Sequence, residues 1–148
     1  MACFVVYLLT QPDGNLYVIL FLASVVASDT GGYVFGVLWG KHPIAPRISP
    51  KKSWEGYFGS VVFAAAVATI LALTLFDAPF WTGLVFGVVI PAFATLGDFS
   101  ESMIKRDLEL KDMGTLLPGH GGVMDRLDSI LPTAPVALVM FSVLPGYL

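Results

Sequence analysis

The sequence predicts an all-α protein, a polytopic bundle of about four transmembrane helices with two charged loops on its cytoplasmic side. Of its 148 residues, 56% are hydrophobic and only 13% are charged, and the mean hydropathy is +0.80. These values lie well outside those of a soluble domain. The apolar residues gather into long stretches, and the basic residues are confined to two segments between them. We therefore treat residues 1–148 as a single transmembrane domain.

Four apolar stretches qualify as spans, measured against the roughly 20 residues that cross a bilayer. They are Leu16–Leu38, Tyr57–Phe76, Phe80–Leu96 and Ile130–Leu144. The last two are shorter than the first two. Pro132 and Pro135 stand near the start of the fourth stretch, where a helix tolerates proline best because the first amides have no partner. The run Ala2–Leu9 is too short to cross a bilayer.

The distribution of charge predicts the orientation of these spans. All eight Lys and Arg residues lie in Lys41–Gly56, the first basic segment, or in Gly97–Ser129, the second basic segment. The positive-inside rule places both segments in the cytoplasm and the turns at 11–15 and 77–79 on the other side. The net charge of −3 argues against nucleic-acid binding. The single cysteine, Cys3, excludes an internal disulfide and a cysteine-based metal site.

The second basic segment interleaves carboxylates, cations and glycines, a mixture that suits polyphosphate chemistry with Mg²⁺. If the third span continues as a helix past Gly97, its polar residues three and four apart share one face. Those residues are Asp98, Glu101, Ser102 and Lys105. Asp125 and Asp128 form a similar pair before the fourth span. The alternative is a solvated loop held by local ion pairs.

Three further features have a functional and a structural interpretation. His120 lies in a glycine-rich turn and is either a phosphate contact or an ordinary loop histidine. Prolines keep the first basic segment extended, and its lysines either bind an anionic ligand or only anchor the topology. Asp29 lies inside a span, where a carboxylate is costly, so we expect it to face the interior as a substrate-facing or interhelical group. Gly32, Gly36 and Gly40 predict close helix packing.

The longest pattern resembles the signature of phosphatidate cytidylyltransferases, also called CDP-diacylglycerol synthases. It runs as Ser102-Met-Ile-Lys-Arg106, then Lys111-Asp-Met-Gly114, then Leu117-Pro-Gly-His-Gly-Gly-Val-Met-Asp-Arg-Leu-Asp-Ser129. Upstream, Ser28–Tyr33, Ser49–Gly56 and Gly97–Ser102 are similar to the same family. The resemblance covers the chain from about Ser24 to Ser129, and its fixed spacing over more than a dozen positions makes it specific.

The resemblance implies a Mg²⁺-dependent, multi-pass membrane enzyme that transfers CMP from CTP to phosphatidic acid at the cytoplasmic face. It also implies a homodimer, room for a second metal ion, and a longer family architecture of which this chain is the C-terminal catalytic portion. The implied metal ligands are Asp98, Glu101, Asp125 and Asp128. The other implied catalytic residues are Lys105, Arg106, Lys111, Asp112, His120 and Arg126. The implied CTP- and lipid-binding residues are Asp29, Ser49, Lys51, Lys52, Gly121 and Gly122.

Two other classes of function remain open at this point. A membrane kinase that phosphorylates a polyprenol or similar lipid alcohol from CTP would need the same carboxylates and cations at the membrane face. A transporter or non-catalytic subunit would also have an intramembrane carboxylate and helix faces of small residues. Neither alternative accounts for the long signature. We therefore expect CTP, phosphatidic acid and membrane lipids as partners, and no nucleic acid.

Overall fold

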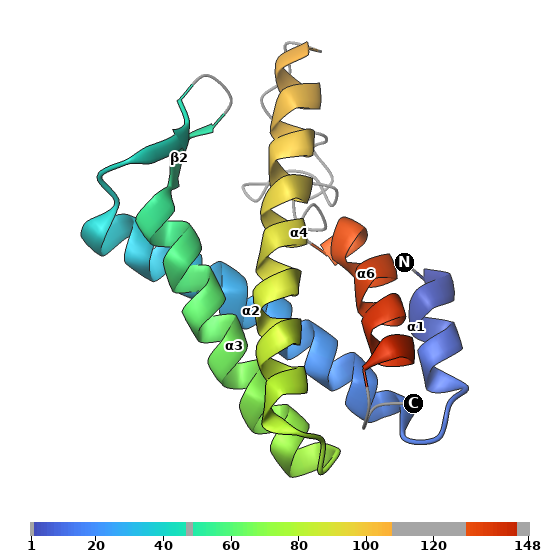
Figure 1. The fold of residues 1–148 in the computed structure, drawn as a ribbon. Helices are drawn as coiled ribbons and strands as arrows, with labels where there is room; N and C mark the ends of the chain where they lie inside the picture. Colours follow the sequence, from blue (N-terminus) through green and yellow to red (C-terminus); the bar gives the residue numbers. More distant parts are fainter. Residues whose placement is uncertain (1, 47–48, 108–129, 145–148) are drawn as a thin grey trace, which may run out of the picture.

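The computed structural model describes residues 2–46, 49–107 and 130–144, and in these ranges the fold is a helical bundle with one small hairpin (Figure 1). The predicted all-α class is confirmed. In chain order the elements are α1 (Ala2–Leu9), α2 (Gly14–Trp39), β1 (Pro43–Ala45), β2 (Ser49–Ser53), α3 (Trp54–Leu75), α4 (Phe80–Asp107) and α6 (Ile130–Val143).

Three of these helices, α2, α3 and α4, are long and apolar enough to cross a membrane. At about 1.5 Å per residue even the shortest of them, α3 with 22 residues, reaches about 33 Å, against a hydrocarbon core of about 30 Å. The fourth predicted span corresponds to α6, an apolar helix of 14 residues that reaches only about 21 Å. Pro132 and Pro135 lie in its first two turns, as the sequence predicted.

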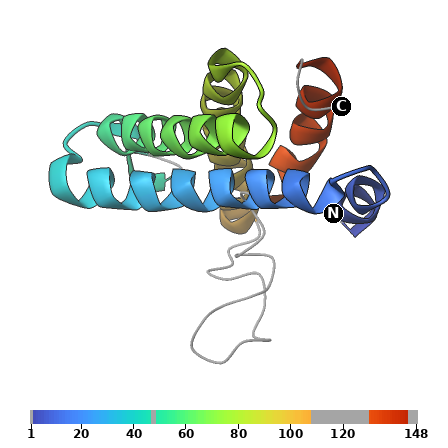
Figure 2. The ribbon, with the colours of Figure 1, turned by 90° about the horizontal axis from the view of Figure 1, so that it is seen from below.

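Small residues bring α2 and α3 together, and Figure 2 shows the two helices side by side. A Cβ on Gly31 would lie 2.4 Å from the carbonyl oxygen of Gly59, so only glycine allows this approach. Across the same interface the Ser60 hydroxyl donates a buried 2.8 Å hydrogen bond to the Ser28 carbonyl oxygen. The predicted packing role of Gly32 is confirmed, because a Cβ there would meet the Ser60 hydroxyl at 2.4 Å.

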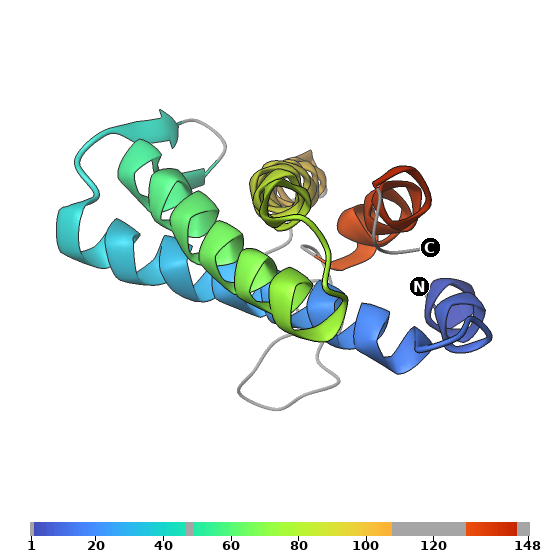
Figure 3. The same cartoon turned by 60° about the horizontal axis from the view of Figure 1, so that its bottom comes forward.

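The next interface, between α3 and α4, also depends on small side chains. A Cβ on Gly87 would lie 2.2 Å from the Cα of Ala65, and one on Gly83 would lie 2.5 Å from the Cα of Thr69. Larger side chains fill the space toward α6, where Phe86 stacks on Phe141 with ring centroids 5.2 Å apart. Figure 3 shows α4 between α3 on one side and α6 and α1 on the other. Small-residue contacts with α3 and aromatic packing against α6 therefore fix the position of α4 in the bundle.

The hairpin and the polar end of α4 lie at the same end of the bundle (Figure 1). Strands β1 and β2 pair antiparallel, with Pro43 opposite Ser53 and Ala45 opposite Ser49. Helix α3 begins directly after β2, and the Ser53 side chain caps it by accepting the Gly56 amide. This N-cap fixes the angle at which the hairpin leaves the helix. The hairpin of the first basic segment and residues 97–107 of the second therefore lie at one end of the bundle.

Candidate active site

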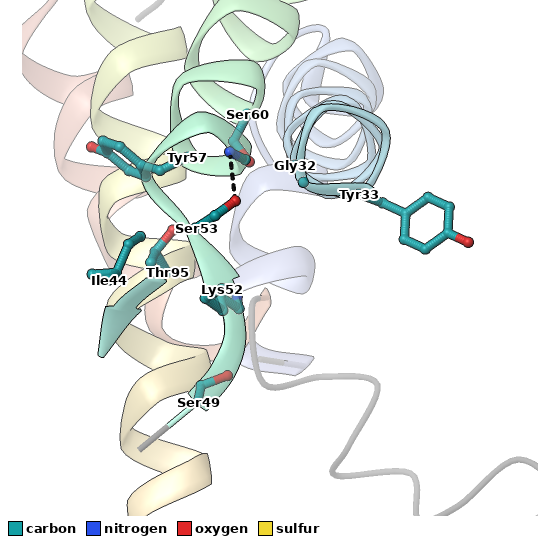
Figure 4. Close-up of a pocket in the computed structure, with 11 residues that line it drawn as sticks. Gly32, Tyr33, Ile44, Ser49, Lys52, Ser53, Tyr57, Ser60 and Thr95 are labelled. Carbon is teal, nitrogen blue, oxygen red and sulfur yellow. Dashed lines mark hydrogen bonds between the residues drawn. The ribbon is translucent and has the colours of Figure 1, made fainter. Parts of the chain in front are cut away.

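A polar pocket of about 310 Å³ lies at this end of the bundle, where the hairpin meets α2, α3 and α4. Figure 4 shows the side chains that surround it. The lining residues come from both strands of the hairpin and from the three helices. They are Gly32, Tyr33, Gly36, Ile44, Ser49, Lys52, Ser53, Gly56, Tyr57, Ser60 and Thr95. Glycines make up part of the wall on the α2 side, so the backbone itself is accessible to a ligand there.

An ion pair crosses this end of the bundle. The ammonium group of Lys52, on β2, pairs with the carboxylate of Asp98, on α4. The two side chains are only 33% and 25% exposed, so their attraction is stronger than that of a fully solvated pair. The Lys52 nitrogen also lies 5.8 Å from the centre of the Phe99 ring, at cation–π distance. The two basic segments, far apart in sequence, thus contribute opposite charges to one place.

Hydroxyl groups supply most of the remaining polar lining. Ser49 and Ser53 come from β2, Tyr57 from α3 and Thr95 from α4. In Figure 4, Tyr57 and Thr95 lie on the same side of the pocket, while Tyr33 points away from it. Hydroxyl groups both donate and accept hydrogen bonds. Together with one cation, they form a surface suited to phosphate oxygens or sugar hydroxyls.

Glu55 holds the ends of the hairpin in place from outside the pocket. One of its oxygens accepts the backbone amides of Lys41 and His42 at 3.2 and 3.3 Å. The other oxygen lies 2.6 Å from the Nδ1 atom of His42. The Trp54 amide donates to the His42 carbonyl oxygen at 3.0 Å and closes the same junction. These bonds tie the end of α2 to the start of α3 and so fix the position from which β2 presents Lys52.

Of the four carboxylates predicted as ligands of a magnesium ion, Asp98 and Glu101 lie in the described part of the chain. The third predicted span ended at Leu96, but α4 runs unbroken to Asp107 and so meets the condition under which these two residues lie one turn apart. Glu101 is buried, at 7% exposure. In the described ranges no group of three or more His, Cys, Asp or Glu residues gathers as a metal site. Two carboxylates still fit Mg²⁺, which commonly takes its other ligands from phosphates and water.

Other predicted site residues fall partly or wholly outside the described part of the chain. Lys51 lies on β2 and Lys105 and Arg106 lie on α4, but their side chains are not among those described. Nothing is described for residues 108–129. The predictions that lie there concern Lys111, Asp112, His120, Gly121, Gly122, Asp125, Arg126 and Asp128.

The prediction that Asp29 faces the interior is wrong for the described structure, in which this residue is exposed. The interior face of α2 is instead formed by Ser24, Ser28 and Gly31, all buried. Successive helical residues are about 100° apart, so Asp29 is turned away from the Ser28 face. It precedes the pocket residues Gly32 and Tyr33 by one turn. A role in binding remains a prediction.

The sequence analysis overlooked Tyr57 and Thr95 as pocket residues, although both had a detectable signal. Thr95 stands three residues before Asp98 and therefore shares its helix face. Tyr57 follows Ser53 by four residues, which puts it one turn into the helix that Ser53 caps. Glu55 was likewise not assigned a role, because an acidic residue in a first helical turn is usually explained by the helix dipole alone.

These features define the class of protein. Three apolar helices of membrane-spanning length, with a charged, hydroxyl-lined pocket at one end, characterise a polytopic helical membrane protein with a polar ligand site. The chain belongs to the cytidylyltransferase family, whose model matches residues 1–144. Family membership agrees with the resemblance seen in the sequence.

Individual relatives make the similarity more specific. The chain is 51% identical to a phosphatidate cytidylyltransferase of Mycobacterium leprae over 144 residues, which cover 97% of this chain and 46% of that protein. It is 37% identical to a protein of the same name from Staphylococcus epidermidis over 132 residues, 88% of this chain and 51% of the relative. The chain thus spans about half the length of the curated relatives that it matches.

Proposed function

We propose that this chain transfers CMP from CTP to phosphatidic acid, giving CDP-diacylglycerol and pyrophosphate. Support comes from the family membership and from relatives named phosphatidate cytidylyltransferase. The observation that carries the proposal is the Lys52–Asp98 pair beside a hydroxyl-lined pocket. It combines a cation for phosphate with a carboxylate for a metal, at the end of apolar helices where a lipid head group would lie.

The reaction needs positioning more than a reactive side chain. A phosphate oxygen of phosphatidic acid forms a bond to the α-phosphorus of CTP, while the bond from that phosphorus to the α,β-bridging oxygen breaks. Pyrophosphate leaves with that oxygen, so no covalent intermediate with the protein is required. In such transfers the protein aligns the two reactants and stabilises the charge that develops on the phosphoryl oxygens.

The pocket residues divide naturally between these tasks. Lys52 would neutralise a phosphate oxygen, and the hydroxyls of Ser49, Ser53 and Thr95 would hydrogen-bond to the ribose or the phosphates. Asp98 would hold Lys52 in the pocket before substrate arrives. The predicted cations of the second basic segment, Lys105, Arg106, Lys111 and Arg126, would add further positive charge around the leaving pyrophosphate.

The metal and the assembly are further parts of the proposal. Mg²⁺ bound at Asp98 and Glu101, with Asp125 and Asp128, would supply charge neutralisation at the triphosphate. A second ion is compatible with this number of carboxylates. The site would face the cytoplasm, because every basic residue of the chain lies in the two basic segments, to which Lys52 and Asp98 belong. A homodimer is the proposed assembly.

CTP labelled at the α-phosphate tests the proposal directly. The chain is incubated with phosphatidic acid and Mg²⁺, alone and together with the N-terminal part of a full-length relative, and the products are separated. We expect label in CDP-diacylglycerol and unlabelled pyrophosphate. Lys52→Gln should slow the reaction by about 100-fold or more. Lys41→Gln is the matched control, because Lys41 is an exposed cation of the same segment and lines no part of the pocket.

Other products would identify the alternative functions. Labelled CDP together with a phosphorylated lipid, formed when a polyprenol replaces phosphatidic acid, would assign the chain to the lipid kinases. No CTP-dependent turnover with the N-terminal part of a relative present would favour a transporter or a structural subunit. Equal rates for Lys52→Gln and Lys41→Gln would show that the chain catalyses the reaction without using Lys52, and would contradict the assignment of this pocket as the active site.

A further inference from the structure

A second hollow, of about 280 Å³, opens next to the polar pocket, between the hairpin and α4. Its lining is almost wholly apolar or aromatic: Ile44, Trp54, Tyr57, Ala92, Thr95, Leu96 and Phe99. Ile44, Tyr57 and Thr95 line both this groove and the polar pocket. The two spaces therefore adjoin, and one molecule with a polar and an apolar part can occupy both.

The groove lies at an end of the bundle where exposed tryptophans indicate a membrane interface. Trp54 is the first residue of α3 and is 58% exposed, and tryptophan is enriched where a membrane span meets the head groups. Trp39, at the end of α2, is similarly exposed at the same end, while the exposed Trp81 begins α4 at the opposite end. Leu96, 57% exposed, leaves the groove open toward the lipid.

A cation marks the boundary between groove and pocket. Phe99 lines the groove, Lys52 lines the pocket, and the Lys52 nitrogen lies 5.8 Å from the centre of the Phe99 ring. The sequence of environments from the membrane inward is thus apolar, aromatic, cationic and then hydroxyl-rich. An anionic phospholipid presents the matching sequence of acyl chain, glycerol and phosphate.

We propose that this groove binds an acyl chain of the anionic phospholipid substrate, with the lipid phosphate at Lys52. The inference rests on the proposed function, since it locates the lipid half of that reaction, and leaves the rest of the pocket to the nucleotide. Van der Waals contacts with the apolar walls would hold the acyl chain, and Lys52 would select an anionic head group over a zwitterionic one. The lipid would then enter sideways from the bilayer rather than through water.

Fluorescence quenching of Trp54 measures occupancy without requiring turnover. The chain has three tryptophans, so Trp39→Phe and Trp81→Phe leave Trp54 as the only reporter. The protein in detergent micelles is titrated with phosphatidic acid brominated in its acyl chains, and separately with phosphatidylcholine carrying the same chains. We expect saturable quenching, with phosphatidic acid binding about fivefold more tightly, as one basic residue near the lipid surface would give.

Two variants separate the roles of chain and head group. Ala92→Phe fills the groove and should weaken phosphatidic acid binding by about tenfold, a loss of about 1.4 kcal/mol of packing contacts between the chain and the walls. Its control is Ile70→Phe, at an exposed apolar position near the other end of α3, which should bind normally. Lys52→Gln should abolish the preference for phosphatidic acid while quenching by both lipids persists.

The inference is overturned if the two lipids quench Trp54 equally in the parent protein, or if Ala92→Phe binds like Ile70→Phe. Absence of quenching by either lipid also overturns it, because protein rather than lipid would then cover the groove. Failure of the proposed function looks different: selective quenching of Trp54 without any CDP-diacylglycerol product keeps the lipid groove and rejects the reaction. Formation of CDP-diacylglycerol without selective quenching of Trp54 keeps the reaction and rejects the lipid groove.

Discussion

Two glycines on α2 should respond in opposite ways to the same substitution. In Gly31→Ala the new Cβ would lie 2.4 Å from the Gly59 carbonyl oxygen, 1.0 Å short of the 3.4 Å at which ordinary contacts begin. That neighbour is backbone, so the two helices must move apart. In Gly36→Ala the nearest atom is the Ser53 hydroxyl oxygen at 3.8 Å, an ordinary contact.

The expected difference follows from two opposing terms. Alanine in place of glycine favours a helix by about 1 kcal/mol, and this gain is common to both variants. Overpacking at Gly31 costs about 1–3 kcal/mol, and separation of the helices also strains the buried Ser60–Ser28 hydrogen bond. Gly31→Ala should therefore have a free energy of unfolding about 1–3 kcal/mol lower than that of Gly36→Ala.

Reversible unfolding in mixed micelles of dodecyl maltoside and sodium dodecyl sulfate, followed by circular dichroism, measures this difference. Gly36→Ala should be as stable as the parent protein or slightly more stable, because only the helix-propensity gain applies to it. Equal stability of the two variants would refute the close α2–α3 approach. A Gly36→Ala variant that is the less stable of the two would place the contact on a different face of α2.

Three other changes test the junctions around the site. Glu55→Gln should speed hydrogen exchange at the two loop amides that the carboxylate accepts, measured by mass spectrometry; unchanged exchange would show that they are protected in another way. In a Cys3→Ser background, single cysteines replacing Arg47 and Thr115 should react with an impermeant thiol reagent from the same side of the membrane. Labelling from opposite sides would contradict the topology. Asp125→Asn should abolish turnover with unfolding unchanged, and full activity would remove this residue from the proposed metal site.

The sequence was sufficient for three of the four predicted spans, because hydropathy reports burial in lipid directly, but the fourth, α6, is too short to cross a membrane in the described structure. Long apolar runs have few alternatives in a bilayer, where every backbone amide needs an internal partner. The ends of the helices were less predictable. Helix α4 continues for eleven residues beyond Leu96, to Asp107. The prediction missed this extension because the polar last turns of the helix carry no hydropathy signal. The hairpin was expected only as an extended, proline-rich segment, since strand pairing depends on how α2 and α3 approach each other.

The small-residue face was predicted in kind but not in detail. Gly32, Gly36 and Gly40 repeat every four residues, and each step advances about 40° around a helix of 3.6 residues per turn. Such a line drifts away from a straight contact. Within the helix the close approach occurs at Gly31 and Gly32, and Gly36 has room for a side chain, whereas a Cβ on Gly40, at the C-cap, would lie 2.8 Å from the Ser53 hydroxyl oxygen. The partner glycines on α3, Gly56 and Gly59, could not be identified from spacing within α2 alone.

The sequence predicted which site residues share a face of one helix, but it could not predict which residues from different elements lie together. The shared face of Asp98 and Glu101 follows from helical geometry once α4 continues past Gly97. The pairing of Lys52 with Asp98 depends on the strand that follows β1 and on the Glu55 contacts that fix it. Asp29 was placed wrongly because the cost of a membrane carboxylate does not specify which face of a helix it occupies.

A double-substitution cycle in the CMP-transfer assay tests the central claim most directly, namely that Lys52 and Asp98 belong to one catalytic site. Turnover is measured for the parent chain, Lys52→Gln, Asp98→Asn and the combination of the two. The account predicts that each single change lowers kcat by about 100-fold or more, and that the double variant is scarcely slower than the slower single variant. Single variants that retain parental activity, or losses that multiply in the double variant, would contradict it.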